Sequence, residues 1–305
     1  MLTTDDLRFF AAIARASSLA AAARDLNVSP PAVTQRLRAL EARLRVHLVD
    51  RSGRHLTLSN EGELLAERGR QVLESLSEID DALAERRGEV RGHLRIVAPL
   101  GFGRRYVAPM VAAFQAEHSE LKIDLALSDR LGGVPGSGSW DLAIHVGEME
   151  HAAPGLIMRN LAPNERWICA APSYLIRHGA PETPVTLRTH SCIALRENDE
   201  DVTLWRFRQS GVGEEHRVRI EPDLASNDGE VVRSWALAGR GLIVRSEWDL
   251  VDDVRAGRLV RLLAAYILPP APVVALLGAR RQSRAARTGR FLDALQRSLE
   301  PVPWR

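Results

Sequence analysis

Residues 17 to 44 constrain the fold of this chain more than any other stretch. A serine pair that can cap a helix opens an alanine-rich run ending at Leu26. The next two residues interrupt the helical pattern, and Ser29 offers a second N-cap. Pro30 and Pro31 follow, and they suit the first turn of a helix because that turn needs no N–H donor. The stretch therefore predicts two helices joined by a tight turn.

The second of these helices carries one apolar stripe. Its members recur at spacings of four, three and four: Val33, Leu37, Leu40 and Leu44. This spacing buries one face and turns the others outward. A helix-turn-helix of this kind can place its second helix in a DNA major groove, although the turn alone equally suits a small helical bundle.

The residues that follow favour DNA binding. Residues 48 to 58 read as two short strands around a glycine turn that carries Arg51, Arg54 and His55, as in a wing. Residues 1 to 58 hold nine arginines against five acidic residues, an excess of four positive charges in a chain whose net charge is +2. Such a head would attract the phosphate backbone of DNA.

A set of residues in this head matches a known family pattern: Leu7, Phe9, Phe10, Ser18, Leu19, Ala22, Ala23, Leu26, Val28, Ser29, Pro31, Ala32, Val33, Thr34, Leu37, Leu40, Glu41, Arg51, Leu58, Ser59, Glu61 and Gly62. Through these residues the head resembles the DNA-binding domain of LysR-type transcriptional regulators. Pro30 departs from the family, where many members have glutamine, and Val49 departs where most have phenylalanine. The first departure removes a possible base contact, and the second thins a small core.

We predict that the DNA-reading residues lie on the outer face of the second helix and on the wing. They are Ser29, Pro31, Thr34, Gln35, Arg38, Arg51, Arg54 and His55. The members on the helix face the major groove, and those on the wing grip phosphate or the adjacent minor groove. Gln35 should be the best base reader, because its amide can pair bidentately with adenine.

A long linker helix is predicted after the wing. Ser59 or Asn60 caps a helical pattern that continues to about Arg87 without proline. Its apolar seam is narrow and resembles a coiled coil: Leu65, Val72, Leu76, Ile79 and Leu83. We expect a homodimer along this seam, and the family resemblance implies a homotetramer. The alternative is a helix packed on its own domain.

Strands and helices alternate beyond a glycine-flanked hinge at residues 88 to 92. Strands are expected near residues 94–97, 121–127 and 141–146, with a helix from about 103 to 118. A second unit of this kind follows and includes a helix from about 228 to 238; the last strand and helix are expected at 273–279 and 284–299. This alternation predicts a parallel α/β sheet.

The same half resembles the two-lobed, periplasmic-binding-protein-like sensor domain of LysR-type regulators. The matching residues are Asp129, 141–147, 171–175, His178, Gly179, Asn227, Asp228, 237–241 and 257–259. His145, where close relatives often carry arginine, and the loop at 133–139 depart from the family.

These observations predict a multidomain chain. An all-α winged helix-turn-helix domain occupies residues 1–59, and a linker helix that forms the dimerisation coiled coil occupies 60–88. An effector-binding α/β domain occupies 89–305, with one lobe at about 93–161 plus 267–300 and the other at 162–266.

The ligand of a two-lobed α/β domain binds where strands end and the lobes meet. We expect the effector site at Leu100, Gly101, Phe102, Gly103, His145 and Asn227. Helix N-termini, a histidine able to carry charge and Phe102 as an apolar wall suit a small organic anion. The alternative is that His145 is a satisfied core histidine and the cleft is unused.

The chain lacks convincing catalytic motifs. Gly101 and Gly103 follow a strand as in a dinucleotide fingerprint, but Tyr106 replaces the third glycine. No Gly-x-Ser-x-Gly elbow is present, and the nine histidines include no pair at metal-ligand spacing. We expect no catalysis, no cofactor and no metal.

Cysteine usage and hydropathy bear on the compartment. Cys169 and Cys192 lie in apolar, strand-like runs without a basic helix terminus or a cysteine neighbour, so buried free thiols are expected; a redox switch, which some family members use, is the alternative. No apolar run approaches ~20 residues, and the start of the chain is not a signal peptide. A cytoplasmic protein without a membrane partner is expected.

The function predicted is that of a bacterial LysR-type transcription regulator. Its partners would be double-stranded operator DNA and a small-molecule effector. One alternative is a small-molecule binding or transport protein, which would need a signal peptide and no basic head. Another is an enzyme with an appended DNA-binding module, which turnover would reveal.

Overall fold

The computed structural model describes residues 1–50, 56–87, 89–128, 140–147, 156–196, 202–211, 213, 215–277 and 286–305. The chain divides into two compact units, residues 1–89 and 90–305. Within the described ranges, no helix is both long and apolar enough to cross a membrane.

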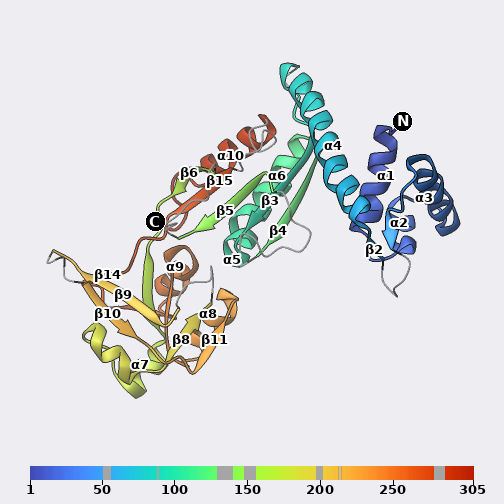
Figure 1. The fold of residues 1–305 in the computed structure, drawn as a ribbon. Helices are drawn as coiled ribbons and strands as arrows, with labels where there is room; N and C mark the ends of the chain where they lie inside the picture. The colour runs from blue at the N-terminus through green and yellow to red at the C-terminus, as the bar shows by residue number, and fades with distance from the viewer. Residues whose placement is uncertain are drawn as a thin grey trace. The chain divides into compact units, whose positions relative to one another are not determined.

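The described residues of the first unit form four helices and a two-stranded sheet, and Figure 1 labels all four of these helices. The helices are α1 (Thr4–Arg15), α2 (Leu19–Asp25), α3 (Pro30–Leu44) and α4 (Asn60–Arg86). The sheet pairs β1 (Val49–Asp50) antiparallel with β2 (Thr57–Leu58). A capping box between Thr3 and Asp6 starts α1, and the Ser18 hydroxyl accepts a hydrogen bond from the Ala21 N–H at the start of α2. The predicted helix-turn-helix and the two strands of the wing are therefore present.

One core holds this head together. Its buried residues are Phe9, Phe10, Ile13, Ala22, Ala23, Val33, Leu37, Leu40, Leu48 and Val49. The stripe predicted for α3 is buried up to Leu40, while Leu44 is only half-buried. Gly62 lets the first turn of α4 lie close to the backbone just before β1, because a Cβ there would lie 2.0 Å from the Leu48 carbonyl oxygen.

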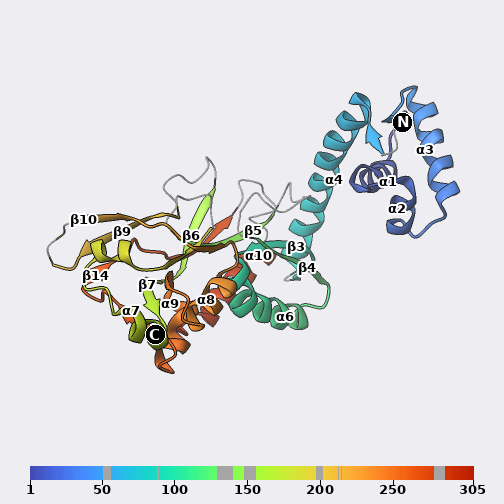
Figure 2. The same cartoon turned by 90° about the horizontal axis from the view of Figure 1, so that it is seen from below.

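The first lobe of the second unit is built on a five-stranded sheet of order β4-β3-β5-β15-β6. The strands are β3 (Gly92–Ala98), β4 (Leu121–Leu127), β5 (Leu142–Val146), β6 (Ile157–Ala162) and β15 (Val273–Leu277). A continuous helical run follows β3, made of α5 (Leu100–Phe102), a π-helical segment (Gly103–Val107) and α6 (Ala108–Glu117). Figure 2 shows α6 of this run from a second direction. The run and α10 (Ala286–Ser298) pack together through Phe114 and Phe291, whose rings are 5.3 Å apart.

The second lobe has a five-stranded sheet of order β11-β8-β12-β7-β13 and a three-stranded sheet of order β10-β9-β14. The strands are β7 (Arg166–Ala170), β8 (Cys192–Leu195), β9 (Leu204–Gln209), β10 (Glu215–Arg219), β11 (Leu224–Ser226), β12 (Leu242–Ser246), β13 (Val260–Leu262) and β14 (Tyr266–Ile267). The helices are α7 (Pro172–His178), the 3-10 helix η2 (Pro184–Thr189), α8 (Gly229–Leu237) and α9 (Glu247–Arg255).

The prediction of a parallel sheet is wrong in part. β3 runs parallel to β4 and β5, but β15 runs antiparallel to β5 and β6. In the second lobe β12 is parallel to β8 and antiparallel to β7. The reason is the double crossing between lobes: β7 and β15 are entered from the other lobe, so no crossover helix forces them to run parallel to their neighbours.

Helix α9 connects the two lobes by packing. Trp248 and Val251 belong to the core of the first lobe, together with Phe102 and Phe291. Leu250, on another side of α9, belongs to a core of the second lobe. The lobes therefore share apolar contacts in addition to the two chain crossings between them.

Candidate DNA-binding and effector-binding sites

The predicted base-reading residues lie along the outer side of α3. Ser29 is the N-cap but makes no capping hydrogen bond through its side chain, and the two prolines occupy the first turn. Ser29, Pro31, Gln35 and Arg38 are exposed. Thr34 is half-buried, and its hydroxyl donates to the Pro30 carbonyl at 3.1 Å. These side chains can meet a DNA groove without any change in the core of the head.

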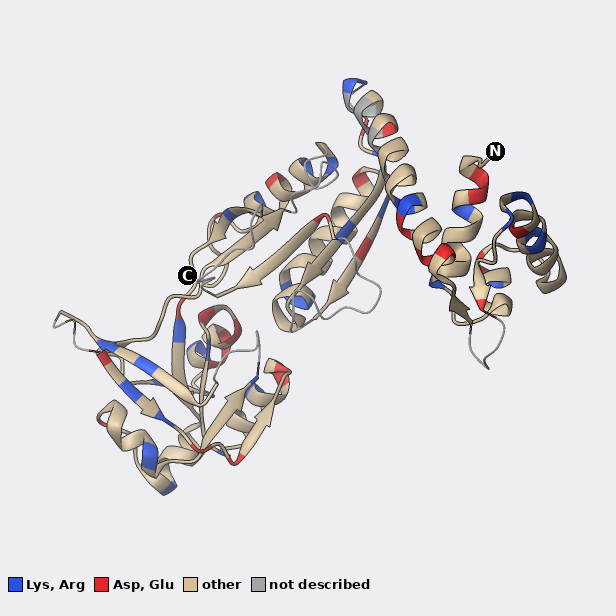
Figure 3. Ribbon diagram, in the orientation of Figure 1, with Lys and Arg blue, Asp and Glu red and all other residues tan. Residues whose placement is uncertain are grey.

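The arginines of α3 fall into two groups. Arg36 pairs with Asp5 and Arg43 pairs with Asp6, each at 2.5 Å, so these two arginines tie α3 to α1. Arg38 lies about half a turn of the helix away from Arg36. Figure 3 shows basic residues along α3 and acidic residues on α1. The ion pairs leave Arg38 as the better candidate for a phosphate contact.

The ion pair with Arg43 also perturbs Asp6. The hydrogen bond from the Arg43 guanidinium lowers the pKa of Asp6 from 3.8 to about 2, although burial acts in the opposite direction. Asp6 is 8% exposed and also accepts hydrogen bonds from the Thr3 N–H and hydroxyl. One carboxylate thus caps α1 and holds α3.

A groove of about 1090 Å³ lies beside Arg38. Arg45 and His47 line it together with the acidic residues Glu41, Asp50 and Glu61. Arg45 follows Arg38 by seven residues and adopts a left-handed conformation, with φ 58°, at the C-cap of α3. The sequence analysis did not include Arg45 among the candidate DNA contacts, although its seven-residue spacing from Arg38 could have indicated it. Arg51, Arg54 and His55 lie outside the described residues and stay predictions.

The apolar seam of α4 is exposed in this single chain. Val72, Leu76, Ile79 and Leu83 have exposed fractions of 48%, 38%, 58% and 50%. Leu65 is different, because it is half-buried and packs against the core of the head. The seam therefore begins at Val72, and including Leu65 in it was wrong.

The segment from Leu100 to Gly103 meets the second lobe. A Cβ on Gly101 would lie 3.0 Å from the Trp248 ring. Phe102 is fully buried, with its ring 4.9 Å from Tyr106 and 5.4 Å from Trp248. The expectation that Phe102 forms an apolar wall of the ligand site does not fit this burial, because its ring belongs to the core.

Arg104 links the same segment to the start of α8. Its guanidinium lies 2.5 Å from Glu230 and 3.5 Å from Asp228, which caps α8. Asn227, just before the cap, is exposed. The structure thus brings the Leu100–Gly103 segment and the start of α8 together, as expected. The first turn of α8 already carries two carboxylates, so its positive end is poorly suited to hold an anion.

His145 lies near the end of β5 and is 5% exposed. A Cβ on Gly147, whose φ is +139°, would lie 3.2 Å from the His145 Nε2 and 3.5 Å from the Arg166 guanidinium. His145 and Arg166 therefore flank Gly147 where the chain leaves β5. Arg166, at the start of β7, is a polar neighbour that sequence reasoning missed.

The two cysteines are free thiols in the core of the second lobe. Cys169 in β7 and Cys192 in β8 are both fully buried. Burial raises the pKa of each thiol to about 12. Neither thiol carries appreciable thiolate near neutral pH, which favours the structural interpretation over a redox switch.

Two family models match this chain. The model described as "Bacterial regulatory helix-turn-helix protein, lysR family" covers residues 4–63, and the model described as "LysR substrate binding domain" covers residues 87–300. The chain belongs to the LysR family of transcriptional regulators. The predicted family and its architecture, a helix-turn-helix domain followed by a two-lobed α/β domain, are confirmed.

Several transcriptional regulators are similar to this chain. The HTH-type transcriptional regulator DmlR of Escherichia coli K12 is 36% identical over 87% of this chain and 85% of its own. The HTH-type transcriptional activator TtdR of the same strain is 32% identical over 86% of this chain and 83% of its own. The structure of CrgA, a LysR-type regulator from Neisseria meningitidis, covers 98% of this chain and 99% of its own at 25% identity, with a TM-score of 0.60.

Proposed function

We propose that this LysR-type regulator reads its operator with the exposed side of α3, and that a small organic anion bound by the second unit modulates this activity. The observation that carries the first part is the division of the α3 surface. Arg36 and Arg43 are tied to α1, while Ser29, Gln35 and Arg38 face outward. A second helix held in this way is the reading element of a helix-turn-helix.

Pairing of two chains along the α4 seam would complete the DNA-binding unit. Four apolar side chains recur at spacings of four, three and four from Val72 to Leu83, and all are exposed in the single chain. Burying them against a second copy removes this apolar surface from water. Two heads held by one coiled coil would bind two half-sites, and pairing of such dimers would give a tetramer.

The anion is assigned to the region that links β5 and the Leu100–Gly103 segment, and not to the start of α8 after Asn227, whose first turn carries two carboxylates. His145 and Arg166 supply groups that can carry positive charge at its first-lobe end. The π-helical segment that begins at Gly103 supports this placement, because such segments occur often at functional sites. We propose a regulatory role without catalysis, which is supported by relatives that are transcriptional regulators, and with it a location beside DNA in the cytoplasm.

In the first experiment, the purified full chain selects fragments of genomic DNA from the source organism. Footprinting then locates the bound site on each selected fragment. The proposal expects a protected site with two related half-sites, and Arg38→Ala should reduce recovery of all fragments. If no site is selected, DNA reading by this helix is contradicted. The same holds if the footprint is unchanged when the solvent-exposed side chains of α3 are replaced by alanine.

The second experiment measures thermal melts of the full chain against a panel of organic anions, cations and neutral compounds. A ligand that binds only the native state stabilises it by about 2.7 kcal/mol at a hundred times its dissociation constant. We expect anions to give the largest shifts, and His145→Ala to reduce them. Best ligands that are cationic or neutral, or shifts that His145→Ala leaves intact with every anion, would contradict the assignment.

A further inference from the structure

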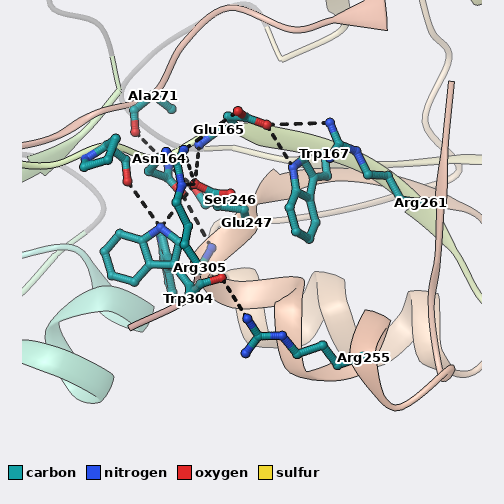
Figure 4. Close-up of polar contacts among 12 residues, drawn as sticks. Asn164, Glu165, Trp167, Ser246, Glu247, Arg255, Arg261, Ala271, Trp304 and Arg305 are labelled. Atoms are coloured by element: carbon teal, nitrogen blue, oxygen red, sulfur yellow. Dashed lines mark hydrogen bonds and ion pairs between the residues drawn. The ribbon is translucent and has the colours of Figure 1, made fainter. Parts of the chain in front are cut away.

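Trp304 lies at the junction where the chain crosses between the lobes (Figure 4). It is 1% exposed, and its ring is 5.3 Å from the Tyr106 ring and 6.1 Å from the Phe102 ring of the first lobe. Its indole N–H points to the Pro163 carbonyl and to Oε1 of Glu247, each at 3.2 Å. The residues after α10 therefore reach a carboxylate at the start of α9.

Glu247 is the first residue of α9 and is 3% exposed. Besides the Trp304 indole, its Oε1 accepts hydrogen bonds from the Arg305 guanidinium at 2.8 and 3.1 Å and from the Glu165 N–H at 3.1 Å. A buried carboxylate is costly unless donors and a counter-ion compensate it. Here Arg305, after α10, supplies the counter-ion. The donors are the Trp304 indole, the Arg305 guanidinium and the Glu165 N–H, the last of which lies on the crossing between β6 and β7.

Asn164 connects the other chain segments that meet at the junction. Its side-chain amide donates to the Ala271 carbonyl at 2.7 Å and to the Ser246 hydroxyl at 3.1 Å. Ala271 lies on the second crossing, between β14 and β15, and its N–H donates back to the Asn164 carbonyl at 3.3 Å. Both crossings, the start of α9 and the Trp304–Arg305 pair are thus connected at one point.

This junction is coupled to the candidate effector segment through α9. Trp248 follows Glu247 directly, and its ring lies against Gly101 and 5.4 Å from the Phe102 ring. Any rotation of the start of α9 would therefore move a side chain that packs on the Leu100–Gly103 segment. Such packed contacts shift between discrete arrangements instead of deforming continuously.

We propose that Glu247, Trp304 and Arg305 form a hinge clamp, a set of positioning residues that fixes the angle between the lobes and thereby the geometry in which the effector is bound. The clamp holds α9 from the first-lobe side. Trp304 is buried in the first-lobe core, and its indole N–H and the Arg305 guanidinium donate hydrogen bonds to Glu247 at the start of α9. Its role for the effector rests on the proposed function, whereas its effect on the lobe angle does not.

The test measures the distance between the lobes in the full chain. Spin labels at Gln115→Cys on α6 and Glu182→Cys in the second lobe sit on exposed positions, and labelled chains are diluted with unlabelled chains. The native cysteines do not compete for label, because burial raises the pKa of both thiols to about 12. Electron–electron double resonance then reports the distribution of inter-lobe distances.

Arg305→Gln removes the counter-ion of Glu247, and Trp304→Phe removes the indole donor while keeping an apolar ring. Both should broaden the distance distribution and speed hydrogen exchange of the Glu165 amide about tenfold or more, since the Glu247 carboxylate that accepts from this amide is no longer held in place. Arg305→Lys keeps the charge and should recover most of the native behaviour. The matched control is Arg297→Gln, an exposed arginine whose side chain bonds its own helix at the Asp293 carbonyl.

Distance distributions and exchange that are unchanged in folded Arg305→Gln would overturn the clamp. If that chain does not fold, Trp304→Phe decides by the same two readouts. These measurements need neither ligand nor DNA, so their failure leaves the proposed function standing. Once an anion is identified, Arg305→Gln should shift its dissociation constant about tenfold while Arg297→Gln leaves it unchanged, and equal constants would overturn the role of the clamp in effector binding.

Discussion

Truncation of Gln35 and truncation of Arg38 should weaken DNA binding in different ways. Gln35→Ala removes a base contact and should cost about 1–3 kcal/mol on the operator with little loss on random duplex. Arg38→Ala removes a phosphate contact, so it should weaken both duplexes alike and reduce the salt slope by about one. Arg36→Ala is the control, because Asp5 already holds that guanidinium. Titrations of the four proteins on both duplexes would contradict the groove assignment if Gln35→Ala lost equally on each.

Asp6 makes a pH-dependent contribution to the head. Its pKa is lowered to about 2, so its stabilising effect is present above pH ~4 and is lost as the pH falls through about 2. The shift from 3.8 corresponds to roughly 2.4 kcal/mol, and screening at the half-exposed Arg43 reduces this to about 1 kcal/mol.

Asp6→Asn should therefore speed hydrogen exchange of the α1 amides at pH 7 and have little effect near pH 2. Asp5→Asn serves as the control, since Asp5 is highly exposed and its pair with Arg36 should contribute less. Equal exchange in the two variants at pH 7 would show that the Asp6–Arg43 pair does not hold α1.

The thiols of Cys169 and Cys192 should be unreactive in the native protein. Because burial raises the pKa of Cys169 and Cys192 to about 12, a thiol reagent at pH 7.4 should modify neither until the chain unfolds. In denaturant both should react. Rapid modification of one thiol in the folded protein would revive the redox-switch alternative.

At the level of elements, α4 makes the sharpest prediction. Leu76→Glu would place like charges opposite each other in a paired helix, so dimerisation and operator binding should be lost together. Ser77→Glu, an exposed neighbour on the same helix, adds the same charge outside the seam and should leave both intact. An unchanged sedimentation coefficient for Leu76→Glu would refute pairing along this seam.

Element type and order in the head could be predicted because each local signal agreed with the fold. The prolines after Ser29 and the 3.6-residue period from Val33 to Leu40 led to α3 with its start at the right residue. Leu65 was misplaced because a heptad count cannot distinguish contact with a partner helix from contact with the head of the same chain. The ion pairs of Arg36 and Arg43 could not be predicted from the sequence either, because they depend on how α1 packs against α3.

At the scale of the whole molecule, strand direction and the effector site were the harder problems. Alternation of strands and helices predicts neighbours in sequence, whereas β15 pairs with β5 across a long stretch of chain. Phe102 looked like a ligand wall because it follows a strand end, but Trp248 and Trp304 arrive from distant parts of the chain and bury it. Trp304 is also part of the proposed hinge clamp, which no local pattern indicates.

The central claim is that operator binding by the head and anion binding by the second unit are coupled. The most direct test titrates the full chain with operator at saturating anion and without it, and then titrates the anion with and without operator. Coupling requires that the anion changes operator affinity and that the operator changes anion affinity by the same factor. The account predicts equal factors of about 5–150, the usual range of allosteric coupling. Identical operator affinity and footprint with and without the anion would contradict it.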